Sequence, residues 1–187
     1  MLAHVLHIIT GLGMGGAERS LFNLAASNSG TDCAHSVVSL ADMGHYGPLL
    51  KQRGVSVHAF DMRSAAVLPN MLLRIHALVR RTRPDIIQGW MPHGNMIATA
   101  VASTMNRQIG LSWNVRQSLY DLCAEKRATQ WMIRGLKIFS ARPDAIIYNS
   151  YQAREHHENL GFSPRHGHVI PNGFDTERGK PEVERRG

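Results

Sequence analysis

Short apolar runs alternate with amphipathic stretches along all 187 residues, and this alternation constrains the fold more than any other feature of the chain. Each run is rich in Val, Ile or Leu and has the length of a buried strand, while the stretches between the runs show helical spacing. Repeated βα units of this kind form a mostly parallel sheet with helices on both faces. The sequence therefore predicts an α/β, Rossmann-like three-layer domain of about seven strands. We expect these strands at residues 4–9, 34–40, 55–60, 85–89, 110–114, 145–149 and 168–170.

Helices are predicted at residues 17–27, 70–83 and 96–105, and the second should end before Pro84, which cannot continue a helix. No linker or repeat interrupts residues 1–171, so we expect a single domain there. Residues 172–187 contain almost no apolar side chains and should form a polar tail, because they cannot bury enough surface to become ordered.

The composition limits where such a chain can act. No apolar run approaches the roughly 20 residues that span a bilayer, and the chain opens into a strand pattern without the basic segment of a signal peptide. Cys33 and Cys123 are too few and too far apart for a disulfide framework or a cysteine-based zinc site. We expect a cytoplasmic protein, and a peripheral contact with the inner face of the membrane remains an alternative.

The formal net charge of +7 should attract anions, such as phosphorylated ligands or acidic membranes. Arginines gather towards the end of the predicted helix 70–83, where they suit the helix dipole or a contact with a membrane surface. Nucleic acid is not expected as a partner. The basic residues are dispersed, and the three tryptophans are not arranged with arginines as a stacking platform.

A glycine-rich segment follows the first predicted strand and precedes the first helix. Its glycines, Gly11, Gly13, Gly15 and Gly16, fit the pattern G-x-G-x-x-G in the context that gives the pattern meaning. Free N–H groups at a helix start suit phosphate oxygens, so we expect an anion or diphosphate site. Two alternatives remain: a tight turn that only permits close packing, or a nicotinamide site in which Asp42 would hold a ribose hydroxyl.

Polar residues also follow the fourth and fifth predicted strands. His93 lies in the segment 89–95, which we expect to be a loop that faces the glycine-rich turn, and Asn114 and Arg116 end the fifth strand. Ligands of open α/β sheets bind at such carboxyl ends. A structural histidine, and an arginine paired with a neighbouring carboxylate, are the alternatives. No serine stands in a recognisable triad order, and no metal site is expected.

Five segments in order resemble the N-terminal domain of GT-B glycosyltransferases, specifically family 4, over nearly the whole chain. They are HIITGLGMGGAER (7–19), WMPHGN (90–95), WNVRQSLYD (113–121), RPDAIIYNS (142–150) and VIPNGFDTER (169–178). The resemblance implies two Rossmann-like domains that face each other across a cleft. The first binds the acceptor, and the second holds the nucleotide-sugar. The second domain is not in this sequence, and residues 172–187 would be a remnant of the interdomain hinge with a polar tail.

The resemblance also implies roles for single residues. Backbone N–H groups of Gly13, Gly15 and Gly16 would lie near the donor diphosphate, and His93 would contact the transferred sugar as the catalytic residue. Arg116, with Asn114 beside it, would hold the acceptor or its phosphate. Stabilisation of the leaving diphosphate by preorganised amides would need neither a metal nor another cofactor.

The chain is thus expected to be the acceptor-binding half of a glycosyltransferase. Such an enzyme moves a sugar from a nucleotide-sugar to a saccharide or lipid-linked acceptor, as in polysaccharide biosynthesis. This half should be inactive without a donor-binding domain supplied in cis or in trans. The alternatives are a non-catalytic module that binds a phosphorylated saccharide or a partner chain, and an NAD-binding Rossmann domain.

Overall fold

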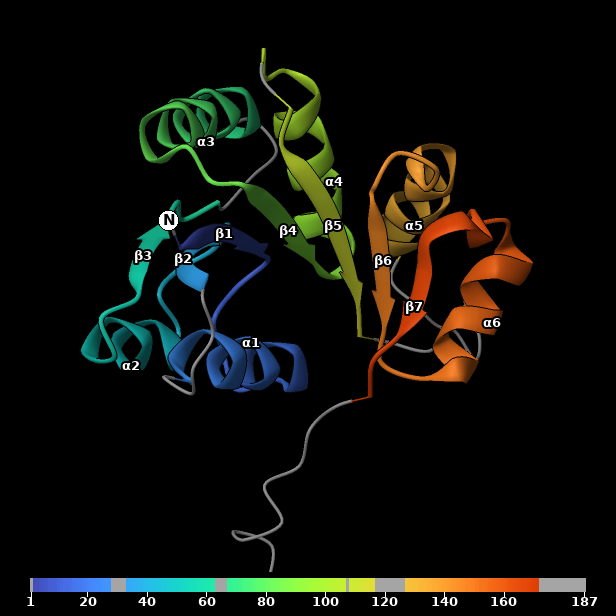
Figure 1. Cartoon of the computed structure of the whole chain (residues 1–187), viewed down its shortest axis with the longest axis horizontal. Coiled ribbons are helices and arrows are strands. Elements are labelled where there is room, and N and C mark those ends of the chain that lie inside the picture. The colour runs from blue at the N-terminus through green and yellow to red at the C-terminus, as the bar shows by residue number, and fades with distance from the viewer. Residues whose placement is uncertain (1, 28–32, 63–66, 107, 117–126, 172–187) are drawn as a thin grey trace, which may run out of the picture.

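Seven parallel strands form one sheet in the order β3-β2-β1-β4-β5-β6-β7, which confirms the predicted α/β class (Figure 1). The computed structural model describes residues 2–27, 33–62, 67–106, 108–116 and 127–171. The strands are β1 (Ala3–Ile9), β2 (Cys33–Ser39), β3 (Ser56–Ala59), β4 (Ile86–Trp90), β5 (Gly110–Val115), β6 (Ala145–Tyr148) and β7 (Gly167–Val169). All seven predicted strands are present, with ends that differ by at most one residue from the expected ones.

Helices cover both faces of the sheet, as the alternating pattern predicts. They are α1 (Gly16–Ala26), α2 (Tyr46–Gln52), α3 (Leu68–Thr82), α4 (Met91–Ser103), α5 (Arg127–Phe139) and α6 (Tyr151–Leu160), followed by a 3₁₀ turn at Pro164–His166. Helices α1 and α2 pack on one face over β1, β2 and β3, and α3, α4 and α5 pack on the other face. The expected three layers are therefore confirmed.

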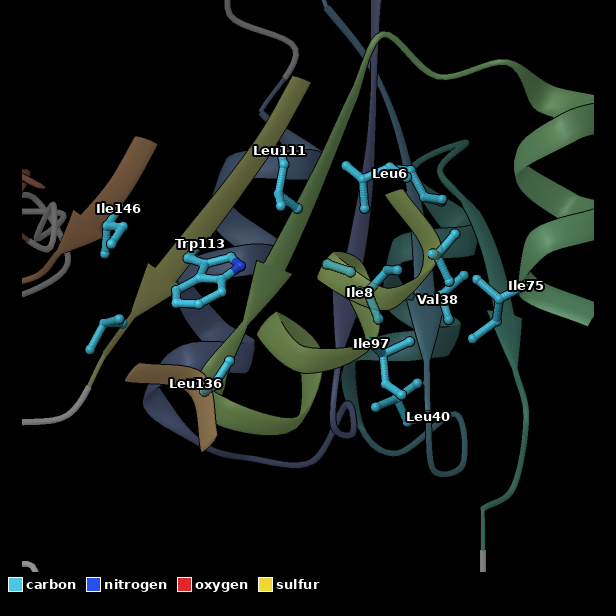
Figure 2. Packing of buried hydrophobic residues seen from close by; sticks show 14 of the residues in the cluster. Leu6, Ile8, Val38, Leu40, Ile75, Ile97, Leu111, Trp113, Leu136 and Ile146 are labelled. Atoms are coloured by element: carbon cyan, nitrogen blue, oxygen red, sulfur yellow. The ribbon is translucent and has the colours of Figure 1, made fainter. Parts of the chain in front are cut away.

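Within the described ranges, the core consists of two apolar clusters, one on each side of the sheet. Leu6 and Ile8 of β1 pack into the larger cluster together with side chains from α3, α4 and α5 (Figure 2). Ile9 points to the opposite face, where it joins Leu12 and Leu21 beneath α1. Alternate residues of a strand point to opposite faces, so β1 is buried on both sides, as expected of a central parallel strand.

The strand order reverses between β1 and β4. The chain runs from β1 outward to β3, crosses back through α3, and continues from β4 to β7 on the other side. The ends of the three central strands are level, because Ile9 pairs with Trp90 and Trp90 pairs with Asn114. The segments that leave these strands therefore meet at one edge of the sheet, where α/β domains of this kind bind ligands.

The structure corrects three local predictions. The segment 89–95 is not a loop, because β4 continues to Trp90 and α4 begins at Met91 rather than at residue 96. Helices α2 and α5 were not among the predicted helices. The expected polar tail at 172–187, and residues 117–121 of one family motif, lie outside the described residues.

Candidate functional site

The glycine-rich turn between β1 and α1 is braced from the side by the segment that follows β2. The Tyr46 amide donates a hydrogen bond to the Leu12 carbonyl at 2.9 Å, and the Ala41 amide donates to the Thr10 carbonyl at 2.9 Å. Gly44 has a φ of +46°, and a Cβ at that position would collide with the Leu12 carbonyl group. The turn is thus held by backbone contacts that only a glycine at position 44 permits.

The glycines of this turn differ in how open they are. No described atom lies within 4 Å of a Cβ built at Gly13 or Gly16, and both residues are exposed. At Gly15, the N-cap of α1, the Glu18 carboxylate lies over the α-carbon. A carboxylate in the first helical turn interacts favourably with the positive end of the helix dipole. An incoming phosphate would therefore approach beside Gly13 and Gly16, or displace the flexible Glu18 side chain.

Strand β4 passes into α4 without an intervening loop. Met91 makes this junction with a φ of +63°, a left-handed conformation that costs about 1–2 kcal/mol in a residue with a side chain. Two glycines allow the first turn of α4 to lie on the strands. A Cβ at Gly94 would collide with the Ile8 carbonyl oxygen, and one at Gly89 would lie 2.7 Å from the Asn95 nitrogen.

His93 therefore belongs to the first turn of α4 and not to a loop. Gly94 of that turn lies against the Ile8 carbonyl oxygen, near the end of β1. Because Ile8 is only three residues before Gly11, the first turn of α4 is a neighbour of the glycine-rich turn. The imidazole is half-buried, and burial lowers its pKa below the ordinary value of 6.5. At neutral pH it is uncharged and offers one hydrogen-bond donor and one acceptor, which suits a sugar hydroxyl. Its catalytic role stays a prediction.

Arg116 lies just beyond β5 at the same edge of the sheet. Its guanidinium carbon stands 5.0 Å from the centre of the Trp90 ring, and the Asn149 side chain donates a hydrogen bond to its carbonyl at 3.2 Å. The guanidinium is half-buried, and this burial lowers its pKa, although an arginine stays charged at every physiological pH. The cation–π contact orients a positive charge close to the first turn of α4.

The rings of Trp90, His7 and His35 contact one another in sequence below this edge of the sheet. This set of contacts was not predicted from the sequence. The Trp90 indole donates a hydrogen bond to His7 Nδ1 at 3.1 Å, and His7 Nε2 lies 3.0 Å from His35 Nδ1. Burial, and then the neighbouring His35, lowers the pKa of His7 to about 3. The ring is therefore neutral, which allows its Nδ1 atom to accept from Trp90. A signal was present in the sequence, because His7 lies between the apolar residues Leu6 and Ile8 in the buried half of β1.

Asn114 lies deeper than expected. It is 2% exposed, and its backbone amide donates to the Asn95 side-chain oxygen at 3.4 Å. Among the described residues, none hydrogen-bonds to the Oδ1 atom of Asn114. Buried amide oxygens usually have a partner. Its predicted role in substrate binding stays a prediction, and it requires an opening above this side chain.

A small pocket lies beside the first turn of α4. Its volume is about 10 Å³, which is room for about one water molecule. It is lined by Met91, Pro92, Asn95, Val115, Arg116, Ile133, Leu136, His157 and Phe162. A space of this size does not hold a sugar.

Asp42 does not have the setting of a ribose-binding acid. Its Oδ1 atom accepts from the Gly44 amide at 3.1 Å, and its carbonyl accepts from the Ser39 hydroxyl at 2.6 Å, so both groups close the turn after β2. In the described ranges, no cluster of three or more His, Cys, Asp or Glu side chains could hold a metal ion. The expectation that no metal or cofactor is needed stays a prediction.

The parallel sheet and its glycine-rich turn at the switch point define the Rossmann-like class of α/β domains that bind ligands at the carboxyl edge. Comparison with known families gives a more specific answer. The sequence profile of glycosyltransferase family 4 matches residues 14–178. The chain belongs to this family, and the predicted resemblance is confirmed.

Solved structures show the same fold at low sequence identity. The structure of HepE from Anabaena in complex with UDP and glucose has a TM-score of 0.76 and 18% identity, and the alignment covers 94% of this chain and 46% of HepE. The lipopolysaccharide outer core galactosyltransferase WaaB has a TM-score of 0.64 and 15% identity over 91% of this chain and 46% of WaaB. A UDP-N-acetylglucosamine 2-epimerase from Rickettsia bellii has a TM-score of 0.60 and 14% identity, with 92% and 45% covered.

The chain spans a little under half the length of each of these proteins, and it corresponds to one half of a GT-B fold. Comparison with curated proteins gave no match.

Proposed function

We propose that this chain is the acceptor-binding half of an enzyme that transfers a sugar from a nucleotide-sugar to a saccharide or lipid-linked acceptor. One observation carries the proposal. The glycine-rich turn, the α4 turn with His93, and Arg116 leave three adjacent strands, β1, β4 and β5, whose ends are level. Support for a nucleotide-sugar as donor comes from HepE, whose structures contain UDP and UDP-glucose.

These residues would divide the chemistry of transfer between them. Negative charge develops on the leaving diphosphate in the transition state, and backbone amides of the exposed residues Gly13 and Gly16 would stabilise it. Neutral His93 would contact a hydroxyl of the transferred sugar. Arg116, oriented on Trp90, would hold the acceptor or its phosphate, and its fork can bind two oxygens at once.

Transfer would require the donor-binding half, supplied by the same chain or a second one. The pocket beside the first turn of α4, with a volume of about 10 Å³, is too small for a sugar. We therefore expect the isolated chain to be inactive. The cytoplasm is the proposed place of action, and polysaccharide biosynthesis the proposed context.

A titration tests the class of ligand. The isolated chain should bind UDP-glucose weakly or not at all in calorimetry, and NAD not at all. Micromolar affinity for NAD would contradict the proposal and favour a nicotinamide-dependent enzyme. Binding of a phosphorylated saccharide, without turnover even when a donor-binding half is added, would instead favour a non-catalytic binding module.

Two substitutions test the site in the enzyme completed with a donor-binding half. Gly13→Ala places a methyl group in open space, so the fold should persist while the KM for nucleotide-sugar rises. His93→Ala should lower kcat by about 10²-fold or more. Gly54→Ala and His76→Ala are matched controls, because these residues lie after α2 and in α3, away from the site. Unchanged kinetics in both site variants would remove this edge from the mechanism.

A further inference from the structure

Helices α3, α4 and α5 carry charge of one sign only, because their charged side chains are all basic. These three helices pack into one apolar cluster on one face of the sheet, and α4 lies between α3 and α5 (Figure 1). Their sequences contain no Asp or Glu. They contain six Lys and Arg residues, namely Arg74, Arg80, Arg81, Arg127, Arg134 and Lys137. Helix α6, which packs into the same apolar cluster through Ala153, contains one arginine and two glutamates, and α1 contains Glu18. The outer surface of α3, α4 and α5 is thus basic.

Helix α5 carries an exposed stripe with apolar residues between the cations. The residues Arg127, Trp131, Arg134 and Ile138 are spaced by four, three and four positions, which places them on one side of a helix. Trp131 is 70% exposed and Ile138 is 77% exposed. The opposite side of α5 supplies Ile133 and Leu136 to the core, so the stripe faces away from this core.

Helix α3 shows the same combination at the other end of the row. Leu73 is 71% exposed, while Arg80 and Arg81 in the last turn are also exposed. The buried side of α3 supplies Ile75 and Val79 to the core. Two helices of one layer therefore present large apolar side chains together with cations.

We infer that the outer surface of α3 and α5 binds an anionic lipid bilayer as a peripheral contact. Tryptophan favours the interface between lipid and water, and arginine and lysine next to it would contact acidic headgroups. A nucleic acid would account for the cations and Trp131 but not for the aliphatic Leu73 and Ile138. A protein partner that covers both kinds of side chain is an outcome that the test below distinguishes from lipid. No described helix is long and apolar enough to cross a membrane, so the contact would lie on the surface. The inference does not depend on sugar transfer, and it extends the expected basic helix 70–83 to a surface shared with α5.

Trp131 makes the contact measurable. The other two tryptophans of the chain, Trp90 and Trp113, are fully buried, so quenching by iodide reports on Trp131. The full chain should sediment with vesicles of phosphatidylglycerol and phosphatidylcholine in equal parts, and much less with phosphatidylcholine alone. Its fluorescence should then shift to the blue and become protected from iodide. Equal binding to both vesicles, or iodide quenching that lipid leaves unchanged, would overturn the inference.

Matched variants separate this surface from overall charge. Arg127→Gln with Arg134→Gln should weaken vesicle binding about 25-fold, about fivefold for each cation. Lys51→Gln with Arg53→Gln removes the same charge from the α2 side and should change binding far less. All four side chains are exposed, so both variants should keep the parental melting temperature.

Three results would contradict a lipid partner. The first is an equal loss of vesicle binding in the α2 variant. The second is a dimer in solution that protects Trp131 from iodide without lipid. The third is that the chain binds nucleic acid tightly and does not bind anionic vesicles.

Discussion

Replacement of Gly44 by alanine should destabilise the domain through its contact with the glycine-rich turn. Gly44 has a φ of +46°, and the atoms nearest to a Cβ there belong to the backbone of Leu12 and Gly13. A flexible side chain could move aside, but this backbone cannot. Leu12 is fully buried beneath α1, and its carbonyl already accepts a hydrogen bond from Tyr46.

Gly54 is the matched control, because it also has a positive φ, of +80°, but no described atom within 4 Å of its Cβ position. Alanine at Gly54 should cost about 1–2 kcal/mol for the left-handed backbone alone. Alanine at Gly44 should cost the same amount plus about 2 kcal/mol for the overlap with the turn. That difference corresponds to a melting temperature about 4–8 °C lower for a domain of this size.

The assay is thermal unfolding of both variants followed by circular dichroism, with urea unfolding to give the free energies. Equal melting temperatures would refute the reasoning, because they would mean that the turn moves away from Gly44 at no cost. In that case, the contacts between the glycine-rich turn and the segment after β2 would not contribute to the stability of the domain.

Two further predictions concern the rings under the site. The pKa of His7 is lowered from 6.5 to about 3 on folding, so protonation favours the unfolded chain. His7 therefore does not reduce the free energy of unfolding above pH 6.5. Below that value, the free energy of unfolding should fall by about 1.4 kcal/mol per pH unit as the pH drops towards 3. His7→Gln should flatten the urea-unfolding free energy between pH 6.5 and pH 4, and an unchanged pH dependence would show that other groups cause it. Trp90→Phe removes the hydrogen bond to His7 and should cost about 1–3 kcal/mol, as should Trp113→Phe, which removes a 2.9 Å bond to Thr99 on the opposite face. Only Trp90→Phe should also raise the KM for the acceptor in the completed enzyme, because only Trp90 contacts Arg116. Equal effects of the two variants on this KM would contradict the role of Trp90.

The fold was predictable because its signals are local. A buried parallel strand needs an apolar run, and each of the seven runs became a strand of the sheet. Pro84 and the left-handed Arg83 end α3 within a residue of the expected place. Helix α2 was missed for an equally local reason. Its seven residues include Gly47 and Pro48, so its sequence carries the signals of a turn.

The site depends on contacts between segments far apart in the sequence, and there the local signals fail. Pro92 and Gly94 are typical of a loop, which is why His93 was expected in one. In the fold, Met91 takes a left-handed conformation, Pro92 fits the first turn of a helix, and Gly94 is needed because that turn lies on the Ile8 carbonyl. The same residues that break a helix in isolation thus start α4 on top of two strands.

This difference changes what His93 can do. A histidine in a loop could reach a ligand from several directions, but a histidine in the first turn of α4 is fixed to the backbone of β1 and β4. The turn is held by glycines at positions 89 and 94, and Trp90 just before it is tied to His7 and stacked with Arg116. If His93 contacts the transferred sugar, then the backbone of β1 and β4, on which the first turn of α4 packs, determines where that sugar lies. Substitutions at Gly94 should therefore lower kcat even when His93 is intact.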